Sequence, residues 1–123
     1  MNPKGSVGFM TNRANEPFVF SDLCQFEDQG GGVKRKILAY GDSLMQVEVH
    51  FEKGSVGAMH SHPHSQLTYV LSGEFEFTVG GEKKIVRQGD TLYKIPNIEH
   101  GCVCLKKGVL LDTFNPYRED FLK

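Results

Sequence analysis

The sequence predicts a single all-β domain. Short segments in which apolar and polar residues alternate fill most of the chain, and glycine-containing turns separate them. The clearest alternation runs over residues 44–51, where Met45, Val47 and Val49 share one face. Strands at intervals of about 8–12 residues are typical of a sandwich or barrel. A doubly wound α/β fold would need helices between the strands, and the pattern shows none there.

Residues 1–29 are predicted to form an N-terminal leader or arm before a domain of residues 30–123. The first fifteen residues are polar and show no period, and residues 18–20 are expected to be a short edge strand or a packing arm. The glycine run of residues 30–32 then breaks the chain.

Within the domain, each expected strand ends at a turn signal such as Gly41-Asp42, Ser72-Gly73 or Gly80-Gly81. The expected strands are residues 36–40, 44–51, 67–71, 75–79, 83–87, 91–95, 100–105 and 109–114. The tail is predicted to be a short helix or turn with Asn115 as its N-cap and Pro116 as its first helical residue.

Composition restricts the class of function. The chain has 123 residues, enough for one core without disulfides, and its 14 basic residues nearly balance its 15 acidic ones. The absence of a basic tract argues against a nucleic-acid partner. No apolar run approaches the roughly 20 residues that cross a bilayer, so no membrane partner is expected. Three cysteines make a poor disulfide framework, and without a secretory signal they predict a cytoplasmic protein.

A histidine-rich stretch, residues 54–66, is the strongest functional signal. In an extended segment His60 and His62 project to the same side, so two imidazoles can converge on one cation. This is half of a metal site, and the remaining ligands must come from elsewhere in the chain. The alternative is a pair of exposed loop histidines.

A second candidate group lies in the last strand. Asp112 and Phe114 share a face, and an acid after the apolar residues 109–111 is costly if it points inward without a partner or a task. Arg118 follows just beyond the next turn. Spacing alone leaves two interpretations: a structural Asp112–Arg118 ion pair, or a general acid/base, an aromatic platform and a carboxylate clamp at Asp112, Phe114 and Arg118.

The histidine stretch resembles the first motif of the cupin superfamily, Gly54-x5-His60-x-His62-x3-Gln66-x6-Gly73. Gln66 stands where most members have Glu, and Gly89-x6-Pro96-x3-His100 is similar to the second motif. The resemblance implies a cupin β-barrel of jelly-roll type. It also implies that one divalent ion is bound by His60, His62, Gln66 and His100.

Three neutral imidazoles and an amide oxygen suit Ni, Zn, Fe, Mn or Co, and affinity order alone does not choose among them. Because Gln66 lacks the charge of Glu, the site favours Lewis-acid chemistry over oxygen chemistry.

A closer resemblance covers most of the chain. The blocks Gly30 to Tyr40, His60 to His64, Phe75-Glu76-Phe77, Pro96 to Cys102 and Asp112-x-Phe114-x-Pro116-x-Arg118 are similar to the pectin-degradation cupins called KdgF.

This resemblance implies an enzyme that converts 4,5-unsaturated uronate monosaccharides, released from pectin or alginate, into the linear 5-keto-4-deoxyuronate. It implies Asp112, Phe114 and Arg118 as catalytic residues and a small sugar acid as the partner molecule. An Fe(II) cupin dioxygenase and a non-catalytic sugar-acid-binding cupin remain the alternatives. A homodimer is also expected, in which the N-terminal segment covers a sheet edge.

Overall fold

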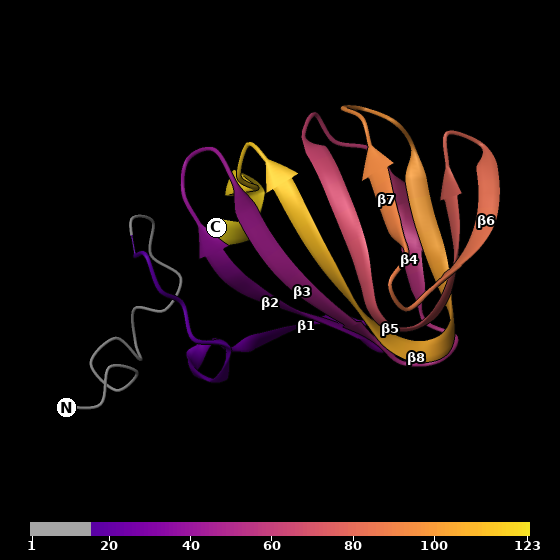
Figure 1. Cartoon of the computed structure of the whole chain (residues 1–123), viewed down its shortest axis with the longest axis horizontal. Helices are drawn as coiled ribbons and strands as arrows, with labels where there is room; N and C mark the ends of the chain where they lie inside the picture. The colour runs from indigo at the N-terminus through magenta and orange to yellow at the C-terminus, as the bar shows by residue number, and fades with distance from the viewer. Residues whose placement is uncertain (1–15) are drawn as a thin grey trace.

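Eight antiparallel strands account for most of residues 16–123, the part of the chain that the structure, a computed structural model, describes (Figure 1). The first fifteen residues of the expected leader lie outside this range. The strands are β1 (Phe26–Gly30), β2 (Val33–Tyr40), β3 (Met45–Phe51), β4 (Val56–His60), β5 (Ser65–Val79), β6 (Glu82–Arg87), β7 (Thr91–Lys94) and β8 (His100–Asn115). Single 3-10 turns, η2 (Ser21–Leu23) and η3 (Glu119–Leu122), flank them.

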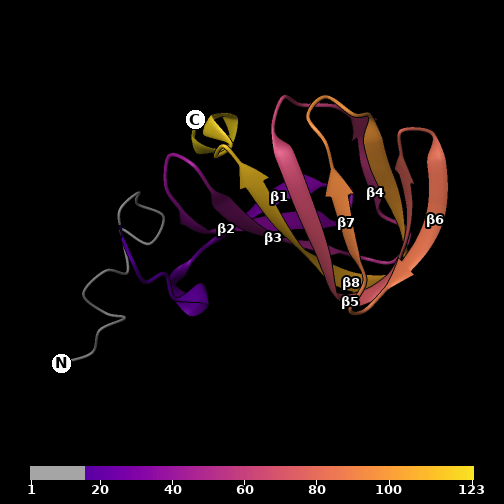
Figure 2. The same ribbon diagram turned by 45° about the horizontal axis from the view of Figure 1, so that its top comes forward.

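The strands follow the order β1-β2-β3-β8-β5-β6, with β4 also paired to β8 and β7 to β5. The two longest strands, β5 and β8, pair along their whole length and bend together, so their halves belong to two facing parts of the barrel (Figures 1 and 2). The first half of β8 pairs with β4, and its second half pairs with β3. This arrangement confirms the expected all-β cupin barrel of jelly-roll type.

At the bend, two pairs of strands that the sequence predicted as separate are continuous: residues 67–71 with 75–79 in β5, and residues 100–105 with 109–114 in β8. Residues 67–71 and 75–79 are one strand, because Ser72-Gly73 forms an irregularity in the ladder and does not reverse the chain. Gly73 has φ +84°, and a Cβ on it would lie 2.6 Å from the Cα of Gly108 on β8. Two glycines therefore let the backbones of β5 and β8 touch where both strands bend.

Side chains from both parts of the barrel fill its interior in two adjoining clusters. The larger cluster comprises Phe51, Val70, Phe75, Phe77, Cys102, Cys104 and Leu110. The smaller comprises Ile37, Met45, Val47 and Phe114. The alternation predicted for β3 is confirmed at Met45 and Val47, which are fully buried.

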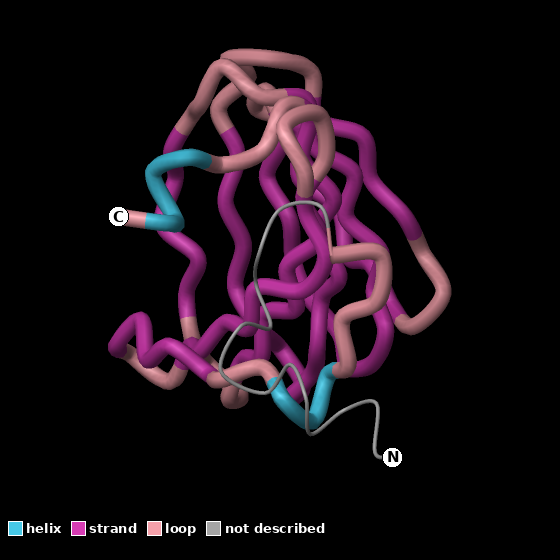
Figure 3. Tube along the Cα trace, turned by 90° about the vertical axis from the view of Figure 1, so that its left-hand side faces the viewer, coloured by secondary structure: helices cyan, strands magenta, loops and turns pink. Residues whose placement is uncertain are grey.

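The chain ends differ from expectation in detail (Figure 3). Residues 18–20 are not a strand, whereas Phe26–Gly30, within the expected leader, pairs with β2. The predicted helix start at Pro116 is wrong, because η3 begins at Glu119 after Arg118. Tyr117 instead stacks on Tyr40, and Arg118 turns its side chain into the barrel.

Candidate active site

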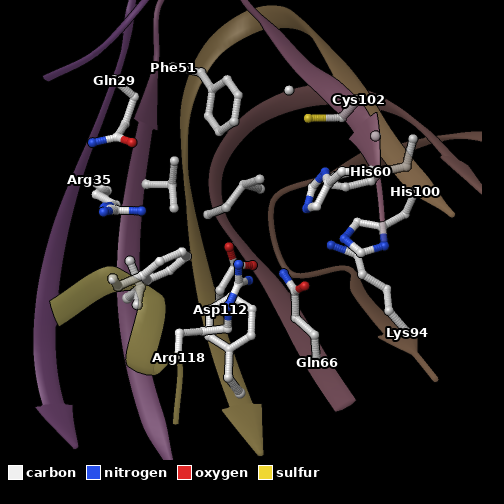
Figure 4. Close-up of a pocket in the computed structure, with 18 residues that line it drawn as sticks. Gln29, Arg35, Phe51, His60, Gln66, Lys94, His100, Cys102, Asp112 and Arg118 are labelled. Carbon is white, nitrogen blue, oxygen red and sulfur yellow. The ribbon is translucent and has the colours of Figure 1, made fainter. Parts of the chain in front are cut away.

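A cavity of about 220 Å³ opens inside the barrel, between the two core clusters and the C-terminal turn. Apolar side chains form much of its wall, among them Val47, Phe51, Phe77, Leu110 and Phe114. Eight polar or charged side chains also reach it: Gln29, Arg35, His60, Gln66, Lys94, His100, Asp112 and Arg118 (Figure 4). Three of the candidate metal ligands and all three candidate catalytic residues therefore line one cavity. His62 does not line it, but its ring centroid lies 4.9 Å from that of His100.

Three histidines converge at one side of this cavity. One ring nitrogen from each of His60, His62 and His100 lies within 4.8 Å of the other two. The pairing of β4 with β8 brings His60 opposite His100, although 40 positions separate them in the sequence. This tertiary pairing supplies the half of the site that the histidine stretch lacks.

The backbone orients two of these rings. His60 Nδ1 lies 2.8 Å from the carbonyl of Ala58, and His100 Nδ1 lies 3.0 Å from the carbonyl of Ile98. Each Nδ1–H donates to a carbonyl oxygen, which leaves Nε2 with a free lone pair. His100 Nε2 is buried without a hydrogen-bond partner among residues 16–123. An orphaned buried nitrogen in a histidine cluster fits a ligand for a cation.

Burial favours the neutral form of the His100 and His62 rings. It lowers the pKa of His100 to about 4, with the nearby Lys94 charge as a second cause. Burial also lowers the pKa of His62. A neutral imidazole offers the lone pair that a metal requires, so the electrostatics and the geometry agree.

Gln66 completes the candidate ligand group. It lies at the start of β5, is buried, and places Oε1 2.9 Å from His62 Nε2. Three imidazoles and this amide oxygen fit a divalent first-row ion.

Asp112 points into the cavity from β8, where its Oδ1 accepts a 2.7 Å hydrogen bond from the Thr68 hydroxyl. Lys94 Nζ donates to the same hydroxyl over 2.8 Å and lies 4.7 Å from the Phe77 ring centre. Thr68 and Lys94 were missed in the sequence. Lys94 shares a face with Leu92 in a four-residue strand, and so short a strand does not reveal which face points inward.

Arg118 does not form the ion pair with Asp112 that one interpretation predicted. Its Nε and Nη2 donate to Asp120 over 3.0 and 2.8 Å. Its guanidinium lies 4.2 Å from the Phe121 ring centre and 5.0 Å from that of Phe114. Arg118 therefore stands beside the aromatic wall with its charge at the cavity.

Arg35, which the sequence did not single out for function, lies against the same wall. Its guanidinium is 3.9 Å from the Phe121 ring centre, and its Nε donates to Glu27 over 2.9 Å. Phe121 thus contacts two guanidinium groups that both line the cavity. With Lys94, these arginines give the cavity three basic side chains beside the single carboxylate of Asp112, so the cavity suits an anionic ligand.

Cys102, Cys104 and His50 show no sign of ligation. Burial raises the pKa of Cys102 to about 11 and also raises that of Cys104, so both behave as small apolar groups. His50 bonds Glu48 over 2.7 Å, away from the cavity. His64 packs edge-on to His62 and Phe114 outside the three-histidine cluster.

The barrel and its histidine cluster define a cupin, and residues 47–114 match the cupin domain family. The pectin degradation protein KdgF of Dickeya dadantii (strain 3937) is 46% identical over 107 residues, covering 85% of this chain and 97% of that protein. The chain belongs to the KdgF family of cupins.

Solved structures agree with this assignment. KdgF from Halomonas sp. superposes with a TM-score of 0.83 at 35% identity, covering 87% of this chain and 99% of that one. An RmlC-like cupin from Shewanella frigidimarina NCIMB 400 superposes with a TM-score of 0.84 at 45% identity, covering 87% and 96%. Within residues 16–123, no helix has the length and apolar character needed to span a membrane.

Proposed function

We propose that this protein opens the ring of 4,5-unsaturated uronate monosaccharides from pectin or alginate and yields the linear 5-keto-4-deoxyuronate. One observation carries the proposal: the Asp112 carboxylate faces the same basic cavity as His60 and His100 of the three-histidine cluster. The kinship with a pectin degradation protein supports a sugar-acid substrate.

In the proposed reaction Asp112 moves the proton. Its carboxylate accepts the proton of the C1 hydroxyl while a carbonyl forms at C1 and the bond from C1 to the ring oxygen breaks. The electrons of that bond stay on the ring oxygen, which becomes an enolate oxygen at C5. Asp112 then delivers the same proton to C4 as the enolate becomes a ketone, so the product is an isomer of the substrate. Such acid–base catalysis typically contributes about 10²–10⁴-fold.

The other cavity residues hold the sugar. The Arg118 guanidinium attracts the carboxylate. Because Asp120 takes the Nε–H and one Nη2–H, the two Nη1–H groups and the second Nη2–H remain as donors for it. Phe114, buried in the wall, packs against the sugar face. A divalent ion held by His60, His62, Gln66 and His100 supplies Lewis acidity and a template for the anionic substrate.

The Asp112→Asn variant tests this proposal. Ring opening, followed as loss of the absorbance of the C4–C5 double bond, should fall about 10²–10⁴-fold toward the uncatalysed rate. Metal content should stay at the wild-type level, because Asp112 is not among the proposed ligands. Ring opening by this variant at the wild-type rate would refute the role of Asp112.

Turnover of the unsaturated uronate without oxygen distinguishes the proposed isomerase from both alternatives, the dioxygenase and the non-catalytic binding protein. A dioxygenase needs oxygen, whereas the proposed isomerisation consumes none, so turnover of the unsaturated uronate should persist without oxygen. A non-catalytic binding protein would bind the uronate without accelerating ring opening.

The homodimeric state and the cytoplasmic location stay predictions. Light scattering on the purified chain tests the homodimeric state.

A further inference from the structure

Thr68 on β5 is fully buried beneath the cavity, and the proposed reaction does not use it. Its hydroxyl makes three hydrogen bonds. Lys94 Nζ donates to it over 2.8 Å, Gln66 Nε2 donates over 3.3 Å, and the hydroxyl donates to Asp112 Oδ1 over 2.7 Å. A hydroxyl has one proton and two lone pairs, so its capacity is used completely.

Two of these partners determine the direction of every bond. An ammonium group can only donate, and an ionised carboxylate can only accept. With Lys94 on one lone pair and Asp112 on the proton, Thr68 has only a lone pair left for Gln66. The amide must therefore turn its NH2 group toward Thr68, and its oxygen then faces the histidines, 2.9 Å from His62 Nε2.

We propose that Thr68, with Lys94, is a positioning residue that orients the Gln66 amide for metal binding and the Asp112 carboxylate for proton transfer. A glutamate offers an oxygen to a cation in either orientation of its carboxylate. A glutamine has one oxygen, and a flipped amide would present NH2, which cannot bind a cation. A Gln at this ligand position therefore needs an orienting partner that a Glu does not, and Thr68 is that partner.

The part of this proposal that concerns Asp112 rests on the proposed function, whereas the part that concerns Gln66 does not. The test therefore begins with metal binding. Full-length protein stripped of metal is titrated with Co²⁺, and the visible absorption of the bound ion is followed. Thr68→Val keeps the shape and removes the hydroxyl. It should weaken Co²⁺ binding about 10–100-fold, the usual effect of losing an outer partner of a ligand, and change the Co²⁺ spectrum.

Ring opening supplies the second readout. At saturating metal, kcat of Thr68→Val should fall about 10-fold or more while KM stays near wild type, because Arg118 and Phe114 are untouched. Thr68→Ser retains the hydroxyl and should restore both properties. Thr113→Val is the matched control, because Thr113 faces away from Asp112 on the same strand and should change neither.

Lys94→Met provides an independent variant. It frees one lone pair of Thr68, so the hydroxyl proton can turn to Gln66 and the amide can adopt either orientation. Its Co²⁺ affinity should lie between those of wild type and Thr68→Val. Wild-type Co²⁺ affinity in Thr68→Val, or in Lys94→Met if the former does not fold, would overturn the proposal. A wild-type protein that binds Co²⁺ but does not open the ring would instead refute only the proposed function.

Discussion

His60 and His100 lie directly opposite each other in the β4–β8 ladder, with ring centroids 4.4 Å apart. Both rings stand at strand ends, and each Nδ1 is bonded to a backbone carbonyl. The pair is therefore oriented by the backbone before any ion binds, which lowers the ordering cost of metal binding.

Removal of one member of this pair should weaken metal binding severely. His100→Ala deletes a buried ring whose Nε2 has no partner within residues 16–123, so the proposed site keeps only two imidazoles and an amide. We expect bound metal, measured by elemental analysis after dialysis, to fall well below one ion per chain. His50→Ala is the matched control, because His50 bonds Glu48 outside the cavity and its loss should leave the metal content unchanged. Equal metal content in the His100→Ala and His50→Ala variants would contradict the proposal that His100 is a metal ligand.

Stability of the metal-free protein should fall in mild acid. The folded pKa of His100 is about 4, below the ordinary 6.5, so the unfolded chain binds more protons between these values. The contribution of His100 to the free energy of unfolding should therefore be complete above about pH 6.5 and should decline as the pH falls toward 4. The loss from this group should be at most about 3 kcal/mol.

Urea titrations of the metal-free protein at pH 7 and pH 5 measure this loss. His100→Gln should show a smaller difference between the two pH values than wild type. His50→Gln, for a histidine outside the cavity, should keep the wild-type difference. A His100→Gln protein with the full wild-type pH dependence would show that other groups cause it.

Arg35 should contribute to substrate binding. Its guanidinium lies on the Phe121 ring beside the cavity, and only its Nε has a hydrogen-bond partner among the described residues. Arg35→Met should raise KM for the unsaturated uronate about 10-fold or more with a smaller change in kcat, since a hydrogen bond to a charged group contributes about 1.5–3 kcal/mol. Arg87→Met removes an arginine that pairs with Glu74 on the surface, and its KM should match wild type.

The bend of the barrel should depend on Gly73. Gly73→Ala forces a left-handed φ on alanine and places its Cβ 2.6 Å from backbone atoms of β8. Gly81→Ala is a matched comparison, because Gly81 has nearly the same φ, +83°, with open space around its Cβ position. Both variants should lose about 1 kcal/mol or more from backbone strain, and Gly73→Ala should lose at least about 2 kcal/mol beyond that in urea denaturation. Equal losses of stability in the two variants would show that the close approach of β5 and β8 at Gly73 does not restrict the residue there.

Local alternation was enough to predict most strands and their inward faces. Met45 and Val47 are buried, and Asp112 and Phe114 share the cavity face, because successive strand residues point to opposite sides of a sheet. The same rule placed His60 and His62 together. The predicted turn at Ser72-Gly73 was wrong, because a Ser-Gly pair in a strand does not by itself distinguish a bulge from a chain reversal.

The sequence alone determined the all-β class, the family and the residues with metal-ligand chemistry, since these depend on period, composition and motif spacing. Only the tertiary structure decided which distant side chains meet. In the structure His100 pairs with His60 across the β4–β8 ladder. Arg118 bonds Asp120 and not Asp112, and Lys94 donates a hydrogen bond to Thr68. These contacts depend on the register between strands far apart in the chain, and register is set by the hydrogen-bonded ladders and the shared bend of β5 and β8.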